Sequence, residues 1–83
     1  MNVTVRYFAS IREAVGLGVE TVQTHGETLG ALRDELMARG EPYVTALARG
    51  KAVRLALDHA MRDESVALRE GGEVAFFPPV TGG

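Results

Sequence analysis

The sequence predicts a two-layer α+β domain, in which a mixed sheet is covered on one face by one long helix. Three observations support this class. Apolar residues alternate with other residues near both ends of the chain, one amphipathic helical stripe lies between them, and the expected order is β-β-α-β-β. The 83 residues, 46% of them hydrophobic, suffice for one domain with one core. A single helix leaves the other face of the sheet open to water or to a partner.

The first strand and the turn after it have clear local signals. Residues 3–8 alternate, so Val3, Val5 and Tyr7 should face the core and Phe8 the open side. Ser10 and Glu13 have the spacing of a capping box, which predicts a short helical turn that stops at a following glycine, Gly16 or Gly18. Residues 19–24 suit a second strand that pairs back on the first.

The long helix is predicted from a cap and a leucine stripe. Thr28 can accept a hydrogen bond from the first turn, and Leu29, Leu32 and Leu36 recur on one face. Gly40 suits the left-handed position that ends a helix. The opposite face should be exposed to solvent, and it carries Arg33, Asp34, Glu35 and Arg39.

The rest of the chain predicts one more helical turn and further strands. Residues 43–49 favour a turn of helix, residues 53–57 alternate as a strand, and residues 66–68 suit a short strand. Residues 70–73 contain two glycines and should turn the chain into a last strand over residues 74–77. There Val74 and Phe76 fit the buried side, which leaves Phe77 on the open face. If the first and last strands are parallel neighbours, the rings of Phe8 and Phe77 lie side by side.

Composition excludes several classes of function. The formal net charge is −2 without a basic block, so nucleic acids and anionic membranes are poor partners. The absence of cysteine excludes disulfides, thiolate metal sites and a cysteine nucleophile. Asp58 and His59 are next to each other, but the sequence shows no third metal ligand to accompany them, so we expect a solvated turn and no metal site. Without a signal peptide or a long apolar stretch, a cytoplasmic location is expected.

The last six residues, Pro-Pro-Val-Thr-Gly-Gly, predict an extended arm. Pro78 and Pro79 remove backbone donors and fix two φ angles, so they end the strand and stiffen the segment. The arm reaches at most about 20 Å at 3.3–3.6 Å per residue. Gly82 and Gly83 can enter a slot too narrow for side chains. We therefore expect a partner enzyme to act on the Gly83 carboxylate; the alternative is a frayed end.

Two segments resemble a known family. EVAFFPPVTGG at residues 73–83 is similar to the C-terminal signature of the small subunits of molybdopterin synthase, and YFASIREAVG at residues 7–16 is similar to their N-terminal segment. The resemblance implies a β-grasp, ubiquitin-like domain over residues 1–77, with first and last strands as parallel neighbours, and a tail over residues 78–83. One position departs, because Asp58 stands where members often carry Asn, and an acid lacks the donors of an amide.

The resemblance also implies a sulfur carrier that binds no cofactor itself. A ubiquitin-activating-type enzyme would use ATP to adenylate Gly83, which then becomes a thiocarboxylate. The tail, formed by Pro78, Pro79, Val80, Thr81, Gly82 and Gly83, would enter the synthase large subunit, which holds the active site. Sulfur would pass there to cyclic pyranopterin monophosphate within a heterotetramer. By position, the family's apolar contacts to the large subunit fall on Phe8, Met61 and Phe77.

Two other functions share the same scaffold and a Gly-Gly end. One is a sulfur carrier for another pathway, such as formation of the thiamine thiazole. The other is a ubiquitin-like modifier that forms isopeptide bonds with lysines of other proteins. The Phe-Phe-Pro-Pro-Val-Thr segment before Gly82 favours the molybdopterin carrier.

Overall fold

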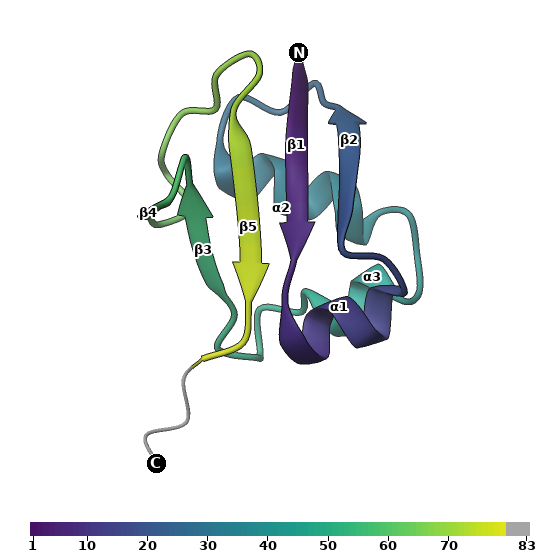
Figure 1. The fold of residues 1–83 in the computed structure, drawn as a ribbon. Helices are drawn as coiled ribbons and strands as arrows, with labels where there is room; N and C mark the ends of the chain where they lie inside the picture. The colour runs from purple at the N-terminus through teal and green to yellow at the C-terminus, as the bar shows by residue number, and fades with distance from the viewer. Residues whose placement is uncertain (80–83) are drawn as a thin grey trace.

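A mixed five-stranded sheet with helices on one side forms the domain in the computed structural model, which describes residues 1–79. The elements in chain order are β1 (Asn2–Tyr7), α1 (Ala9–Val15), β2 (Val19–Gln23), α2 (Leu29–Met37), α3 (Tyr43–Ala46), β3 (Arg54–Leu57), β4 (Ala60–Met61) and β5 (Glu73–Phe77). The strand order is β2-β1-β5-β3-β4 (Figure 1). β1 and β5 pair in parallel, whereas the other neighbours are antiparallel. The predicted α+β class and mixed sheet are confirmed.

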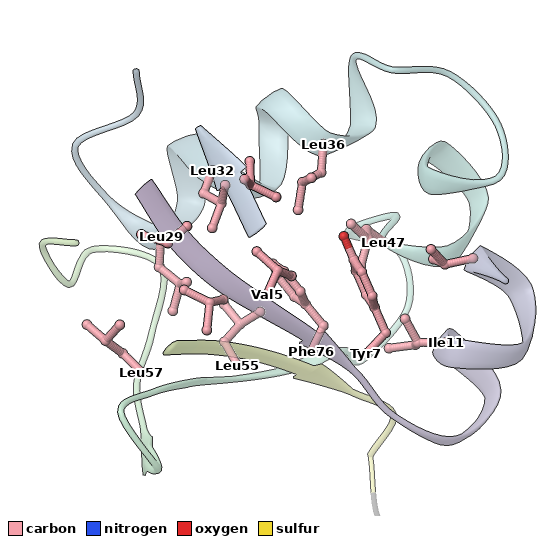
Figure 2. Close-up of a cluster of buried hydrophobic side chains, with 14 of the residues drawn as sticks. Val5, Tyr7, Ile11, Leu29, Leu32, Leu36, Leu47, Leu55, Leu57 and Phe76 are labelled. Atoms are coloured by element: carbon pink, nitrogen blue, oxygen red, sulfur yellow. The ribbon is translucent and has the colours of Figure 1, made fainter. Parts of the chain in front are cut away.

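The core lies between α2 and the sheet (Figure 2). Leu29, Leu32 and Leu36 are fully buried, as the helical stripe predicts. The sheet contributes the inward-facing positions of β1 and β5, and the rings of Tyr7 and Phe76 stack there with centroids 6.1 Å apart. Burial of each such side chain contributes about 1.5–3 kcal/mol to folding. The alternation predicted for both strands is therefore confirmed.

Local capping explains where the helices begin and end. The Thr28 hydroxyl accepts a hydrogen bond from the Ala31 N–H at 3.1 Å, which confirms the predicted cap of α2. The prediction of a capping box at Ser10 is wrong. Helix α1 already begins at Ala9, and the Phe8 carbonyl accepts the first backbone hydrogen bonds of this helix. Gly16, with φ of 91°, ends α1 in the left-handed conformation that glycine favours.

Two short segments differ from the prediction. Residues 66–68 do not form a strand, although Leu68 is buried and one isolated bridge joins Thr28 to Ala67. The fourth strand of the sheet is instead β4, which is two residues long and therefore too short to produce a periodic signal. The helical turn predicted over residues 43–49 is confined to α3.

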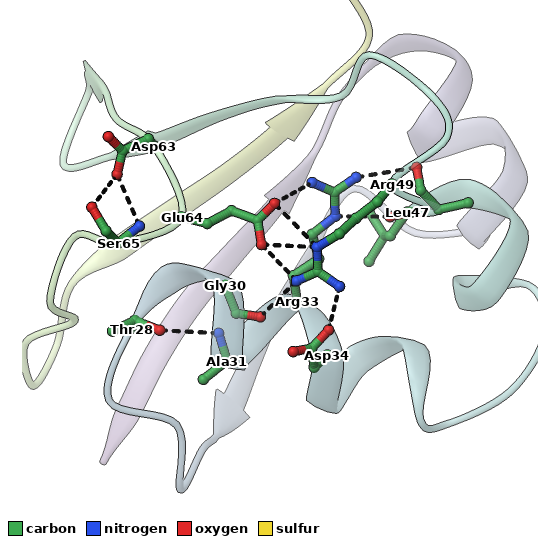
Figure 3. Close-up of polar contacts among 11 residues, drawn as sticks. Thr28, Gly30, Ala31, Arg33, Asp34, Leu47, Arg49, Asp63, Glu64 and Ser65 are labelled. Carbon is green, nitrogen blue, oxygen red and sulfur yellow. Dashed lines mark hydrogen bonds and ion pairs between the residues drawn. The ribbon is translucent and has the colours of Figure 1, made fainter.

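The prediction that Arg33 lies on the solvent-exposed face of α2 is wrong. Its residue surface is 3% exposed, and its guanidinium donates to the carbonyl oxygens of Leu47 at 2.8 Å and Ala48 at 3.1 Å (Figure 3). A third donation reaches Glu64 at 3.2 Å. The loop after α3 exposes carbonyls that need donors, and the long arginine side chain supplies them. Arg33 therefore holds that loop against α2.

Beneath the end of β1, a polar cluster surrounds Glu20. Its carboxylate accepts hydrogen bonds from the Tyr7 hydroxyl at 2.7 Å, from Arg39 at 3.0 Å and from the Tyr43 hydroxyl at 3.1 Å. Burial opposes ionisation of Glu20, but these donors outweigh burial and hold its pKa below the usual value. Burial, together with the Glu20 carboxylate, raises the pKa of Tyr7.

Acid is expected to destabilise the domain through Glu20. The pKa of Glu20 in the folded state lies below its value in the unfolded state, which is about 4.3. Ionised Glu20 therefore stabilises the fold above about pH 4.3, and this stabilisation is lost as the pH falls through the pKa of the folded state. Glu20→Gln should lower the free energy of unfolding at pH 7 by about 1–2 kcal/mol and flatten its decline in acid. Urea denaturation between neutral and acid pH measures both. An unchanged acid profile in Glu20→Gln would contradict the assignment.

Candidate functional site

The register of the central strands brings two aromatic rings together at the end where β5 leaves the sheet. Tyr7 pairs with Phe76, and the Phe8 N–H donates to the Phe76 carbonyl at 3.1 Å. The rings of Phe8 and Phe77 meet edge to face with centroids 6.2 Å apart. Phe8 is 45% exposed. The prediction that these rings lie side by side on the open face is confirmed.

Met61 lies on the same open face. The pairings run from Arg6 through Ala75 and Ala56 to Met61 across four strands. Since Leu55 and Leu57 face the core, Ala56 between them faces the open side. Met61 is 54% exposed. We define the open-face patch as Phe8, Ala56, Met61, Ala75 and Phe77.

The patch has small residues at its centre and large side chains around them. Ala56 and Ala75 are paired with each other, and both lack the bulk to rise above the sheet. Phe8 and Met61 are exposed on this face, and exposed apolar side chains grouped on one face of a sheet are of the kind that marks protein–protein contacts. The role of Phe8, Met61 and Phe77 in binding a partner remains a prediction.

A group of polar and charged side chains flanks the open-face patch, and the sequence analysis did not identify this group. Arg6 Nε lies 3.1 Å from a Glu73 carboxylate oxygen, and His59 Nε2 lies 3.4 Å from the other. Opposite charges at open-face positions of the first and last strands were a signal, but only the parallel register makes the residues neighbours. These groups place polar contacts along one edge of an apolar surface.

The tail leaves the domain beside a small groove. β5 ends at Phe77, since proline lacks the N–H that a continued ladder requires. Pro78 is half-buried and Pro79 exposed. Together they line a groove of about 130 Å³, whose other walls are Ser10, Ile11, Ala14, Ala46, Lys51 and Val53. The remaining predicted tail residues lie outside the described residues: Val80, Thr81, Gly82 and Gly83.

Asp58 and His59 form the turn between β3 and β4, which confirms the solvated-turn prediction. Their φ angles are 50° and 70°, the positive values that a two-residue type I′ hairpin requires. The Asp58 carboxylate accepts from Arg69 Nε at 2.7 Å and from the Glu73 N–H at 3.0 Å. The hydrogen bond from Arg69, with that from Glu73, holds the pKa of Asp58 below its usual value. The turn therefore needs a hydrogen-bond acceptor in the side chain at position 58, and both Asp and Asn provide one.

Asp58→Asn should leave the stability of the domain nearly unchanged. Asn tolerates positive φ and keeps one oxygen for the Glu73 N–H, while the exposed ion pair with Arg69 contributes little. We expect an unchanged midpoint of urea denaturation. Asp58→Ala, which lacks the acceptor and tolerates positive φ less well, is the matched comparison and should unfold at a lower urea concentration. Equal losses in both variants would contradict this account of the turn.

Within residues 1–79, no helix has the length and apolar character needed to cross a membrane. A parallel central pair, three antiparallel pairings and a helix across one face define the β-grasp, or ubiquitin-like, class of protein. The family comparison is more specific. The chain belongs to the ThiS family, whose model matches residues 5–83.

Named relatives match over nearly the whole chain. The chain is 38% identical to the molybdopterin synthase sulfur carrier subunit of Escherichia coli, covering 98% of this chain and 99% of that protein. It is 35% identical to the Haemophilus influenzae protein of the same name, covering 95% and 96%. Among solved structures, a complex of subunits 1 and 2 of the molybdopterin-converting factor from Helicobacter pylori has a chain 26% identical to this one. That match has a TM-score of 0.70 and covers 100% of both chains.

Proposed function

We propose that this protein is the sulfur carrier of a molybdopterin synthase. An activating enzyme joins the Gly83 carboxylate to AMP from ATP, with release of pyrophosphate. A sulfur donor then attacks the acyl carbon, AMP leaves, and a terminal thiocarboxylate remains. That sulfur passes to cyclic pyranopterin monophosphate in the cavity of the large subunit. The full-length similarity to named sulfur carrier subunits supports this proposal.

The single observation that carries the proposal is the position of the open-face patch beside the tail exit. Phe8 and Phe77 touch each other, and Pro78 follows Phe77 directly. A partner that covers the patch would receive the tail at the edge of the same interface. The carrier then needs no catalytic group of its own, because the enzymes that hold its tail supply the chemistry. We place this exchange in the cytoplasm.

The proposal is tested by loading the protein with sulfur. Purified protein is incubated with ATP, an activating enzyme of the ubiquitin-activating type and a sulfur donor, and its mass is measured. We expect a gain that equals replacement of one oxygen by one sulfur, followed by loss of that gain when large subunit and cyclic pyranopterin monophosphate are added. Sulfur loading without molybdopterin formation would favour a carrier for another pathway. Lysine-linked ladders in extract would favour a modifier.

A further inference from the structure

Arg54 is a charged residue at the border of the open-face patch. It is the first residue of β3 and pairs with Phe77 of β5, so the two side chains lie on the same face of the sheet. Leu55, the next residue, is buried in the core, and alternation gives Arg54 the same orientation. Ala56, two residues after Arg54, belongs to the patch. Arg54 is exposed and therefore lies directly beside the apolar surface.

The acidic side chains around this face are already paired with other arginines. Arg6 Nε lies 3.1 Å from a Glu73 carboxylate oxygen, and Arg69 Nε lies 2.7 Å from an Asp58 carboxylate oxygen. Among the ion pairs formed within residues 1–79, none includes Arg54. Arg54 therefore gives this face an unbalanced positive charge, although the chain as a whole has a formal net charge of −2.

A partner that covers the patch must accommodate the charge of Arg54. Because Arg54 and Phe77 are cross-strand neighbours, a surface that contacts the ring also approaches the guanidinium. Removal of a charge from water opposes binding unless an opposite charge or hydrogen-bond acceptors replace the lost water. The guanidinium presents its donors in a fixed fork, which matches the two oxygens of a carboxylate. A basic partner surface would therefore fit this border of the patch poorly.

We propose that Arg54 determines the specificity of this interface by pairing with an Asp or Glu carboxylate of the partner. This inference rests on the proposed function, under which the partner that covers the patch is the large subunit of the synthase. The carboxylate accepts hydrogen bonds from the Arg54 guanidinium, and a surface with a lysine or arginine at the same place is excluded by repulsion. The pair also speeds association at low salt, because opposite charges steer two proteins together.

The test measures the affinity and the association rate of the full chain for the purified large subunit. Arg54→Gln removes the charge and should weaken binding about 10-fold, whereas Arg54→Glu reverses it and should weaken binding about 100-fold or more. Arg54→Lys keeps the charge and should lose less affinity than Arg54→Gln. At about 1 M salt, where the Debye length is about 3 Å, the parent and Arg54→Gln should associate at nearly equal rates. The midpoint of urea denaturation should not change, because Arg54 is exposed.

A second charge change separates the local charge at Arg54 from the charge of the whole chain. Glu27 is exposed and lies just before α2, the helix that covers the opposite face of the sheet (Figure 1). The double variant Arg54→Glu, Glu27→Arg has the composition and the net charge of the parent, and it should bind as weakly as Arg54→Glu alone. Glu27→Arg alone should bind like the parent. Recovery of affinity in the double variant would show that only the overall charge matters and would overturn the inference.

Charge reversal on the partner identifies the acid. Exposed carboxylates of the large subunit are replaced by lysine one at a time, and each variant is mixed with Arg54→Glu. One of them should restore binding by at least about 10-fold. Failure of every replacement to restore binding, or parent-like affinity of Arg54→Gln, overturns the inference while sulfur loading of the parent remains intact. If the parent itself does not bind the large subunit, the proposed function fails and the inference fails with it.

Discussion

Deletion of Gly83 is expected to abolish sulfur loading and to leave the domain as stable as the full chain. The shortened protein still ends in a glycine carboxylate, that of Gly82, so the chemical group is retained. The position of this carboxylate changes, however, because the tail is shorter by about 3.3–3.6 Å. Reacting atoms must approach within about 3–3.5 Å, and a displacement of about 1 Å can lower the rate 100-fold. We therefore expect loading to fall at least about 100-fold.

Two further variants separate the length of the tail from the identity of its last residues. Deletion of Thr81 keeps the Gly-Gly end but shortens the arm equally, and should fail in the same way. Thr81→Ser keeps the length and should load normally. The readouts are the mass gain from sulfur and the melting temperature, which should not change because the core lies within β1 to β5. Normal loading after deletion of Gly83 would show that the reacting carboxylate is elsewhere.

Period-two alternation predicted the two central strands well because each has one face buried under α2. Val5 and Phe76, at inward positions, are fully buried, whereas Phe8 is largely exposed. Alternation gives no information on which strands are neighbours, since pairing joins residues far apart in sequence. The parallel pairing of β1 with β5 was expected only from the resemblance of the terminal segments to a known family.

The errors occurred where a distant part of the chain decides the local environment. Arg33 is buried because loop carbonyls at residues 47 and 48 accept its donors, and nothing near residue 33 indicates them. Ser10 has a favourable spacing for a cap, but the helix after β1 is capped two residues earlier, at Phe8, with Ala9 at a positive φ of 50°. Such a φ is costly for alanine, so propensity would not predict it.

The candidate site was predictable to different degrees. Alternation placed Phe8 and Phe77 on the open face, whereas Met61 came from the family resemblance alone, because β4 is too short to be recognised. The groove beside the tail exit was not predicted, since its walls come from α1, α3, the loop before β3 and the two prolines, which are far apart in the sequence.

Phe8→Ala and Phe77→Ala should each weaken binding to the large subunit by about 30-fold or more. Aromatic anchors at the centre of an interface contribute about 2–4 kcal/mol when truncated, and every 1.4 kcal/mol is a factor of ten. Titration calorimetry with purified large subunit measures the change. Val44→Ala is the control, because Val44 is 44% exposed, similar to Phe8, but lies on α3 outside the open-face patch. Its affinity should equal that of the parent.

The double variant tests whether the two rings act as one anchor. Since they contact each other edge to face, removal of the first ring should weaken what the second contributes, and the combined loss should be smaller than the sum of the single losses. Urea denaturation of the free protein distinguishes binding from folding. Phe8 is exposed and Phe77 half-buried, so each free variant should lose less stability than binding energy. Variants that bind normally but unfold more readily would assign the rings to the stability of the sheet and remove the patch from the interface.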